Sequence, residues 1–309
     1  MAFVVSSLTN YINEQSTELL GRSFFEARSG SYFGNTQTGI KTSDALQLLA
    51  VNAFPQADSC GFTASGSTTF TQRLLTVGAI KYQDSLCPKD LKAKWTQILL
   101  RPGSNAENEE LTFANYIADH LISLIHEQVE ILDWRGNIDS GDPLLNKYDG
   151  LIKIIDAAAG VVSGNTGSVT SITSSNAIAV FNAMCDAAPA KIKTKSDKIL
   201  FVGTDVFDTY INALMAGNLF HTNATNYADY EVVVPGKNVR VVGVHGLDST
   251  NRMFLGRAEN FYKGTDLESD KEEFRMWYSM DDDNIKYSVR FKRGVQVAYP
   301  NEIVQFTLS

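Results

Sequence analysis

The segment SNAENEELTFANYIADHLISLIHEQVEILDWR spans residues 104–135. It opens with a capping box, in which the Ser104 hydroxyl accepts from the amide of Glu107 and the Glu107 carboxylate accepts from the amide of Ser104. Apolar residues then recur every three or four positions up to Gly136: Leu111, Ala114, Ile117, Ala118, Leu121, Leu124, Ile125, Val129 and Leu132. The pattern predicts a single amphipathic helix of about 45 Å, which is much longer than the mean globular helix and suits the spine of a flat subunit.

The sequence before this helix predicts two short helices and a pair of strands. The apolar spacing over residues 6–28 and 42–54 favours helices, and Pro55 would end the second one. Residues 68–75 and 77–82 are rich in β-branched and aromatic side chains, so we expect two strands that form a hairpin. These pieces have little apolar cover nearby in the sequence. We therefore expect them to pack on a neighbouring chain.

The sequence after the long helix mixes helices and strands. Helices are predicted over residues 148–159, 175–188 and 205–216, and a buried strand over 198–203. Further strands are predicted over residues 231–234, 239–244 and 252–255, followed by two long strands over 274–280 and 285–291. The four residues Asp281 to Asn284 join the long strands. The order of these elements predicts an α+β fold.

The bulk composition limits the class of protein. The 309 residues are 44% hydrophobic and 20% charged, which is globular composition with ample material for a core. A net charge of −8 argues against a protein whose main work is to neutralise phosphates. No apolar run is long enough for a membrane helix, and the first residues do not resemble a signal peptide, so we expect a soluble protein that is not exported by a classical signal. The cysteines Cys60, Cys87 and Cys185 are widely spaced, and we expect buried free thiols.

Two clusters invite a metal-binding interpretation that their spacing does not support. His120 and His126 lie on the long helix, with Glu127 and Glu130 nearby. The histidines are spaced i,i+6, which places their rings about 120° apart on the helix wheel, whereas a helical zinc motif places both on one face. The acidic run at Asp281 lacks the glycine and the distant glutamate of a calcium loop. We therefore expect no metal ion and interpret the acidic run as a hairpin turn.

Motifs for nucleotide binding and nucleophilic catalysis are also missing. The glycines Gly160, Gly164 and Gly167 do not have the dinucleotide-binding spacing, and the sequence contains no nucleophile-elbow motif. Lys191, Lys193, Lys195 and Lys198 form one basic cluster and Lys89, Lys92 and Lys94 another, which we interpret as solvated surface. We expect no catalytic residue and no cofactor, so the chain is not predicted to be an enzyme.

The C-terminal region resembles a family of viral shell proteins. The segments NFYKGTDL (260–267) and RFKRGVQVAYPNEIV (290–304), with the two long strands between them, are similar to the end of the major capsid proteins of tailed bacteriophages, which have the Hong Kong 97-type fold. Upstream, GIKTSDA (39–45), CGFT (60–63), Ile80-Lys81 and Leu86-Cys87-Pro88 look like the capsid proteins of crAss-like and related phages. The resemblance covers nearly the whole chain, and its motifs are structural rather than catalytic.

This resemblance implies a division of the chain into named regions. Residues 1–57 would form the N-terminal arm and 58–103 the extended hairpin loop. Residues 104–194 would form the peripheral domain with its spine helix at 104–135, and 195–270 the mixed axial domain. Residues 271–309 would carry the long strands back to the peripheral domain.

The resemblance also implies a function. The chain would be a structural protein that self-assembles into the pentamers and hexamers of an icosahedral shell around double-stranded DNA, which it would enclose without sequence-specific binding. It would be made in the cytoplasm of a bacterial host and end in the virion capsid, with no membrane contact. Some members of the family join subunits by a lysine-to-asparagine isopeptide bond; no residues of this sequence match that pair and its catalytic acid, so we expect no cross-link. Separate scaffolding and portal proteins, and decoration proteins, are the expected partners. An encapsulin-like compartment shell and a cytosolic enzyme without a recognisable motif remain as alternatives.

Overall fold

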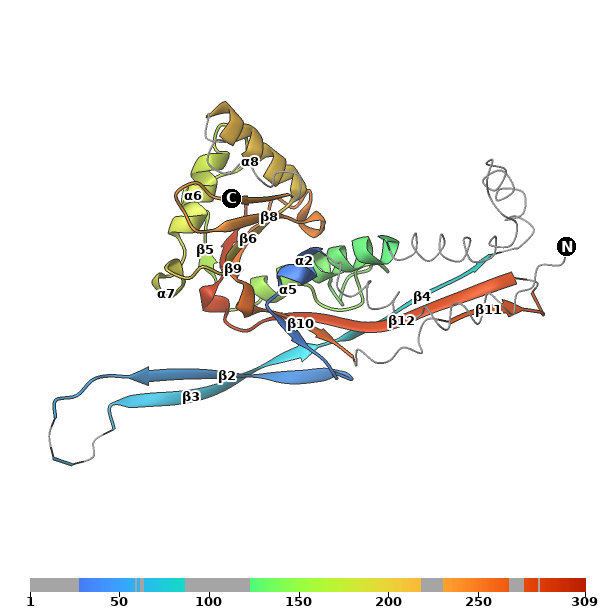
Figure 1. Ribbon diagram of the computed structural model, residues 1–309, viewed down its shortest axis with the longest axis horizontal. Coiled ribbons are helices and arrows are strands. Elements are labelled where there is room, and N and C mark those ends of the chain that lie inside the picture. The colour runs from blue at the N-terminus through green and yellow to red at the C-terminus, as the bar shows by residue number, and fades with distance from the viewer. Residues whose placement is uncertain are drawn as a thin grey trace, which may run out of the picture.

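The computed structural model describes residues 28–58, 60–61, 64–86, 123–217, 230–266, 275–282 and 284–309. Two sheets and a projecting two-stranded hairpin make up this part of the chain (Figure 1). Its helices are α2 (Arg28–Tyr32), a helix over residues 123–135, α5 (Leu151–Asp156), α6 (Ala177–Asp186), α7 (Ala190–Lys193) and α8 (Thr204–Ala216). Its strands are β1 (Asn35–Gln37), β2 (Ser43–Ala53), β3 (Gly66–Thr76), β4 (Gly78–Leu86), β5 (Val162–Ser163), β6 (Lys198–Val202), β7 (Glu231–Val233), β8 (Arg240–Gly243), β9 (Met253–Arg257), β10 (Phe261–Thr265), β11 (Arg275–Ser279), β12 (Asn284–Val297) and β13 (Val304–Phe306).

The six-stranded sheet has the order β5-β13-β9-β6-β8-β7 and carries apolar cores on both faces. Every residue of the central strand β6 is buried. Its Leu200 and Val202 point to a core shared with α6 and α8, while Ile199 and Phe201 point to an aromatic core with Trp134. A strand covered on both sides needs an unbroken apolar run, which is why residues 198–203 were readable as a buried strand. The predicted helices over 175–188 and 205–216 are confirmed by α6 and α8.

The second sheet is organised around β12, which runs for 14 residues. Strand β11 and strand β4 pair with its first part on opposite sides, and β10 pairs with its last part. The predicted long strands over residues 274–280 and 285–291 are therefore confirmed, and the second extends to Val297. The helix over residues 123–135 ends at Gly136, whose amide donates to the Leu132 carbonyl. The rest of the predicted long helix, with its capping box, lies outside the described residues, as does all but Arg28 of the predicted helix over residues 6–28.

The predicted helix over residues 42–54 is wrong, because this segment is strand β2. It pairs with β3 at eleven consecutive positions, from Ser43 opposite Thr76 to Ala53 opposite Gly66. Alanine and leucine give the segment a high intrinsic helix propensity, but propensity is a weak term that a continuous ladder of cross-strand pairs overrides. The expected boundary between arm and extended loop, at residues 57 and 58, therefore falls in the turn of this hairpin.

The predicted pairing between the strands over residues 68–75 and 77–82 is also wrong. Strand β4 leaves β3 after Val77 and pairs with β12, from Gly78 opposite Arg293 to Leu86 opposite Ile285. The single residue between the two strands is too short for a hairpin turn. A Cβ atom at Gly78 would lie 2.1 Å from the Lys147 carbonyl oxygen, so this crossing point requires glycine.

Candidate assembly surfaces

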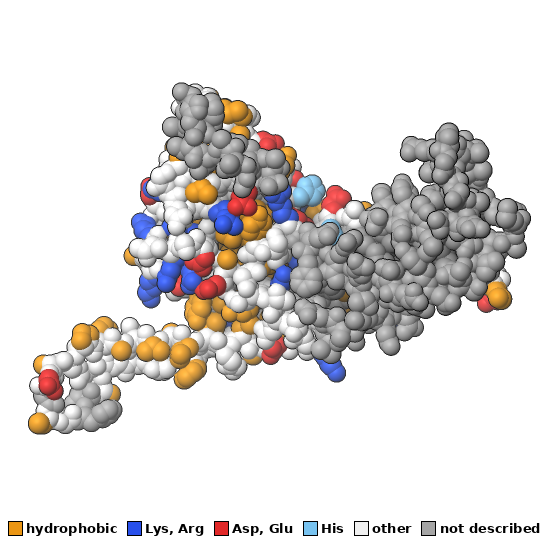
Figure 2. Space-filling view, in the orientation of Figure 1, with side chains coloured by type: hydrophobic (Ala, Val, Ile, Leu, Met, Phe, Trp, Pro, Cys, Tyr) orange, Lys and Arg blue, Asp and Glu red, His pale blue; other side chains and the backbone are white. Residues whose placement is uncertain are grey.

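The β2–β3 hairpin presents one apolar face to solvent. Leu49 lies opposite Phe70, Val51 opposite Thr68, and Ala45 opposite Leu74. Directly opposed residues and alternate residues along a strand share a face of a β-ribbon, so Leu49, Val51, Phe70 and Leu74 lie on the same face. Their exposed fractions are 50%, 63%, 75% and 62%, respectively. We call these four residues the apolar face of the hairpin, and Figure 2 shows hydrophobic side chains along the projecting ribbon.

The base of the hairpin is fixed to the body of the protein. Leu46 and Leu75 are buried in a small cluster with Ile40 and Val77. The Gln296 side-chain amide on β12 donates to the Leu74 carbonyl at 2.6 Å. Beyond this base the ribbon projects away from both sheets, as Figure 1 shows for β2 and β3. The hairpin is thus a rigidly rooted arm whose far half has no apolar cover from the described part of its own chain.

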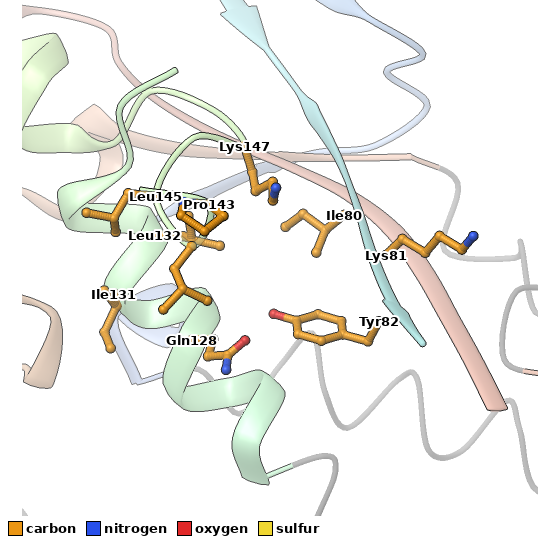
Figure 3. Close-up of a pocket in the computed structure, with 10 residues that line it drawn as sticks. Ile80, Lys81, Tyr82, Gln128, Ile131, Leu132, Pro143, Leu145 and Lys147 are labelled. Carbon is orange, nitrogen blue, oxygen red and sulfur yellow. The ribbon is translucent and has the colours of Figure 1, made fainter. Parts of the chain in front are cut away.

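A groove of about 360 Å³ lies between β4, the helix over residues 123–135 and the loop at 143–147 (Figure 3). Ile80, Ile131 and Leu132 form much of its wall, and the Tyr82 hydroxyl points into it. Burial raises the pKa of Tyr82 to about 12, so its phenol stays neutral at physiological pH. The polar side chains that line the groove, among the described residues, are those of Lys81, Lys147, Gln128 and Tyr82. Its apolar wall suits a packed side chain of a partner.

A buried ion pair joins the helix over residues 123–135 to β12. The Asp133 carboxylate accepts from the Arg293 guanidinium at 2.9 and 2.5 Å and from the Tyr148 hydroxyl at 2.6 Å. Burial by itself would lower the pKa of Arg293, but the Asp133 carboxylate outweighs it and the pKa is raised. Burial, reinforced by the Asp133 charge, holds the pKa of Tyr148 well above its usual value. All three groups are enclosed by the structure, so their role is to hold two elements together.

Most residues that the sequence suggested as metal ligands do not come together in the structure. Among the described residues, no group of three histidine, cysteine or acidic side chains could hold a metal ion. Asp281 and Asp282 occupy an exposed turn between β11 and β12, as the hairpin interpretation predicts. A Glu127 oxygen lies 3.5 Å from the His245 ring, and the two residues are too far apart in the sequence for a local motif to connect them. His120 is outside the described residues.

Two smaller expectations, that the cysteines are buried and that the basic cluster at Lys191 to Lys198 is solvated, are wrong in part. Cys185 is buried as expected, whereas Cys60 is exposed and Cys87 lies outside the described residues. Lys198 is buried and donates to the Lys193 carbonyl, so it does not belong to the solvated basic cluster. Within the described ranges, no helix is both long and apolar enough to cross a bilayer.

Comparison with known proteins gives matches among solved structures alone. No family model and no curated protein sequence matches the chain. A chain of the satellite phage P4 procapsid matches with a TM-score of 0.57 and 12% identity, over 94% of this chain and 98% of that one. The cyanophage A-1(L) capsid matches with a TM-score of 0.58 and 12% identity, over 92% and 93%.

A virus-like particle from Pyrococcus furiosus also matches, with a TM-score of 0.52 and 10% identity, over 95% of this chain and 98% of that one. At these low identities, the structural similarity shows the fold and nothing more. The chain has the α+β, Hong Kong 97-type fold of phage major capsid proteins, as the C-terminal resemblance predicted.

Proposed function

We propose that the chain is the major capsid protein of a tailed bacteriophage, and that its copies assemble as pentamers and hexamers into an icosahedral shell around double-stranded DNA. The shared fold with phage capsid chains over more than nine-tenths of the sequence supports this proposal. The largely apolar wall of the groove, which suits packing against a neighbouring copy, also supports it. On this view the protein is structural and is not an enzyme.

The apolar face of the hairpin is the observation that carries the proposal. Four large apolar side chains, each at least half exposed, lie on one face of a rooted arm, with the Gln47–Gln72 pair between Leu74 and the other three. Leu49, Val51 and Phe70 are neighbours on that face, and an exposed apolar patch marks an interaction surface. Fully burying a phenylalanine is worth about 1.5–3 kcal/mol, so covering the exposed three-quarters of Phe70 contributes roughly 1–2 kcal/mol per contact. A closed shell repeats that contact in every copy.

We also propose a role for each region of the subunit. The hairpin over residues 43–76 is the extended loop that reaches a neighbouring copy. The peripheral domain comprises the long helix and the β12 sheet, and the axial domain lies within residues 195–270. Scaffolding, portal and decoration proteins are the proposed partners, the host cytoplasm the place of synthesis, and the virion capsid the final location.

The experiment replaces two residues of the apolar face by threonine, which suits a strand but buries less apolar area against a neighbouring copy. In Leu49→Thr/Phe70→Thr, the ribbon keeps its β-propensity and loses two apolar side chains. The matched control, Ala50→Thr, changes the adjacent exposed position on the opposite face. We expect the wild type and the control to elute from gel filtration as megadalton particles, and the double variant as folded small species. A double variant that forms intact shells overturns the proposal, as does a wild type that stays monomeric at high concentration.

An encapsulin-like compartment is the second candidate, because the virus-like particle from Pyrococcus furiosus covers the chain to the same extent. In an encapsulin-like compartment, the hairpin variants would affect assembly in the same way, but the particles would hold different contents. Particles produced during infection and treated with nuclease should retain double-stranded DNA if the phage proposal is right. Particles that hold a protein cargo and no DNA would favour the compartment.

A further inference from the structure

Three exposed lysines gather at one end of the body of the protein. Lys191 and Lys193 lie on α7, and Lys195 follows in the turn before β6. All three residues are exposed, whereas Ile192 on the same helical turn is buried in the core with α6 and α8. We call Lys191, Lys193 and Lys195 the α7 lysine patch. Figure 2 shows blue side chains at the end of the body where Figure 1 places α7.

The carboxylates next to the patch already have cationic partners. Asp186, the last residue of α6, pairs with Lys237. Asp197, directly before β6, pairs with Arg257 at 3.0 Å, and the same guanidinium also holds Glu259 at 2.6 Å. These acidic groups are therefore not available to neutralise the patch. Within the described part of the chain, its three lysines carry charges that no ion pair compensates.

A fourth lysine lies beneath the patch. Lys198 is buried, and its ammonium group donates to the Lys193 carbonyl at 2.5 Å, which fixes the end of α7 to β6. Lys198 also lies opposite Arg257 across the β6–β9 ladder. The patch is thus a positive region on a chain whose net charge is −8. At about 0.1 M salt, charges farther away than about 10 Å are largely screened, so the local excess decides which ligand binds here.

We propose that the α7 lysine patch binds the phosphate backbone of duplex DNA, without regard to base sequence. Lysine carries a compact charge on a flexible stem, which suits a phosphate, and phosphate contacts read no bases. Protein–protein interfaces are instead depleted of lysine and have an apolar centre, whereas the exposed residues of segment 191–196 are lysine, threonine and serine. The inference rests on the proposed function for the source of the DNA. In a capsid, the patch would mark the surface of the subunit that faces the packaged genome.

The test is the affinity of the full-length protein for a fluorescent duplex of about 30 base pairs, measured by anisotropy between about 50 and 200 mM salt. Each phosphate contact contributes about −0.9 to the slope of log affinity against log salt, so three contacts predict an affinity about 40-fold lower at the higher salt. A second duplex of unrelated sequence should bind equally well. The variant Lys191→Gln/Lys193→Gln/Lys195→Gln should lose the binding of both duplexes together with this salt dependence.

The matched control, Lys41→Gln/Lys153→Gln/Lys286→Gln, removes three charges from separate places, two of them in ion pairs, and should bind as the wild type does. All proteins are compared at the same oligomeric size. The proposal is overturned by a wild type that does not bind the duplex, by wild-type affinity in the patch variant, or by an equal loss in the control. Tighter binding of polyglutamate than of DNA also overturns it. Failure of the proposed function is read separately, as a lack of particles in gel filtration or of nuclease-resistant DNA inside them.

Discussion

Replacing Asp133 by asparagine keeps the shape of the side chain and removes the negative charge that faces Arg293. The Arg293 guanidinium is buried, with 3% of its side chain exposed, so it cannot turn to water for solvation. Removing one partner of a buried ion pair costs about 3–5 kcal/mol, because the remaining charge is left without compensation. The weakened hydrogen bond from Tyr148 adds up to about 1 kcal/mol. We therefore expect Asp133→Asn to lose about 3–6 kcal/mol of unfolding free energy.

Urea unfolding of purified subunits, followed by circular dichroism, measures this loss as a lower midpoint at unchanged slope. Asp282→Asn, which breaks an exposed pair with Lys286, is the control and should not shift the midpoint measurably. A triple variant, Asp133→Leu/Arg293→Met/Tyr148→Phe, removes all three polar groups and should be more stable than Asp133→Asn alone. A loss below about 1 kcal/mol in Asp133→Asn, or a triple variant less stable than the single one, would refute the assignment of the cost to an uncompensated buried charge.

Two further predictions concern packing and thiol reactivity. Gly294→Ala should destabilise the subunit in thermal unfolding, because the added Cβ atom would lie 2.1 Å from the Thr76 carbonyl oxygen; Gly141→Ala, where no atom lies within 4 Å, should be neutral. A wild-type melting temperature for Gly294→Ala would show that the crossing of β3 and β12 is looser than the structure indicates. Burial raises the pKa of Cys185 to about 11, so alkylation of the native protein at pH 8 should modify Cys60 and spare Cys185 until denaturant is added. Equal labelling of both thiols, read by mass spectrometry, would contradict the buried environment.

Sequence patterns predicted an element best where the burial of its side chains follows a regular pattern within that element. Strand β6 was readable because both of its faces are covered, and α6 and α8 were readable because each presents one apolar stripe to a sheet. The two long strands were readable from their alternation and from the acidic turn between them. The resemblance of the C-terminal segments to phage capsid proteins correctly indicated the fold, and structural comparison confirmed it.

The hairpin and the ionic junctions could not be obtained from sequence patterns. Residues 43–53 favour a helix by intrinsic propensity, and they form a strand because β3 supplies eleven pairing partners. The apolar face follows from the register of that pairing, which local sequence does not specify. The partners Asp133 and Arg293 are 160 residues apart, and Glu130 meets Arg28 across 102 residues.

The amino-acid sequence alone therefore determined the α+β class, the buried strand and the amphipathic helices, because each of these depends on contacts or periodicities within a short segment. The resemblance to phage capsid proteins came from the quoted motifs and from the order of the elements along the chain. The tertiary structure alone decided which strands pair, which face of the hairpin is left uncovered, and which charges are buried together. These features depend on contacts between residues that are distant along the chain, and the free energy of such contacts exceeds the local preferences that a sequence pattern records.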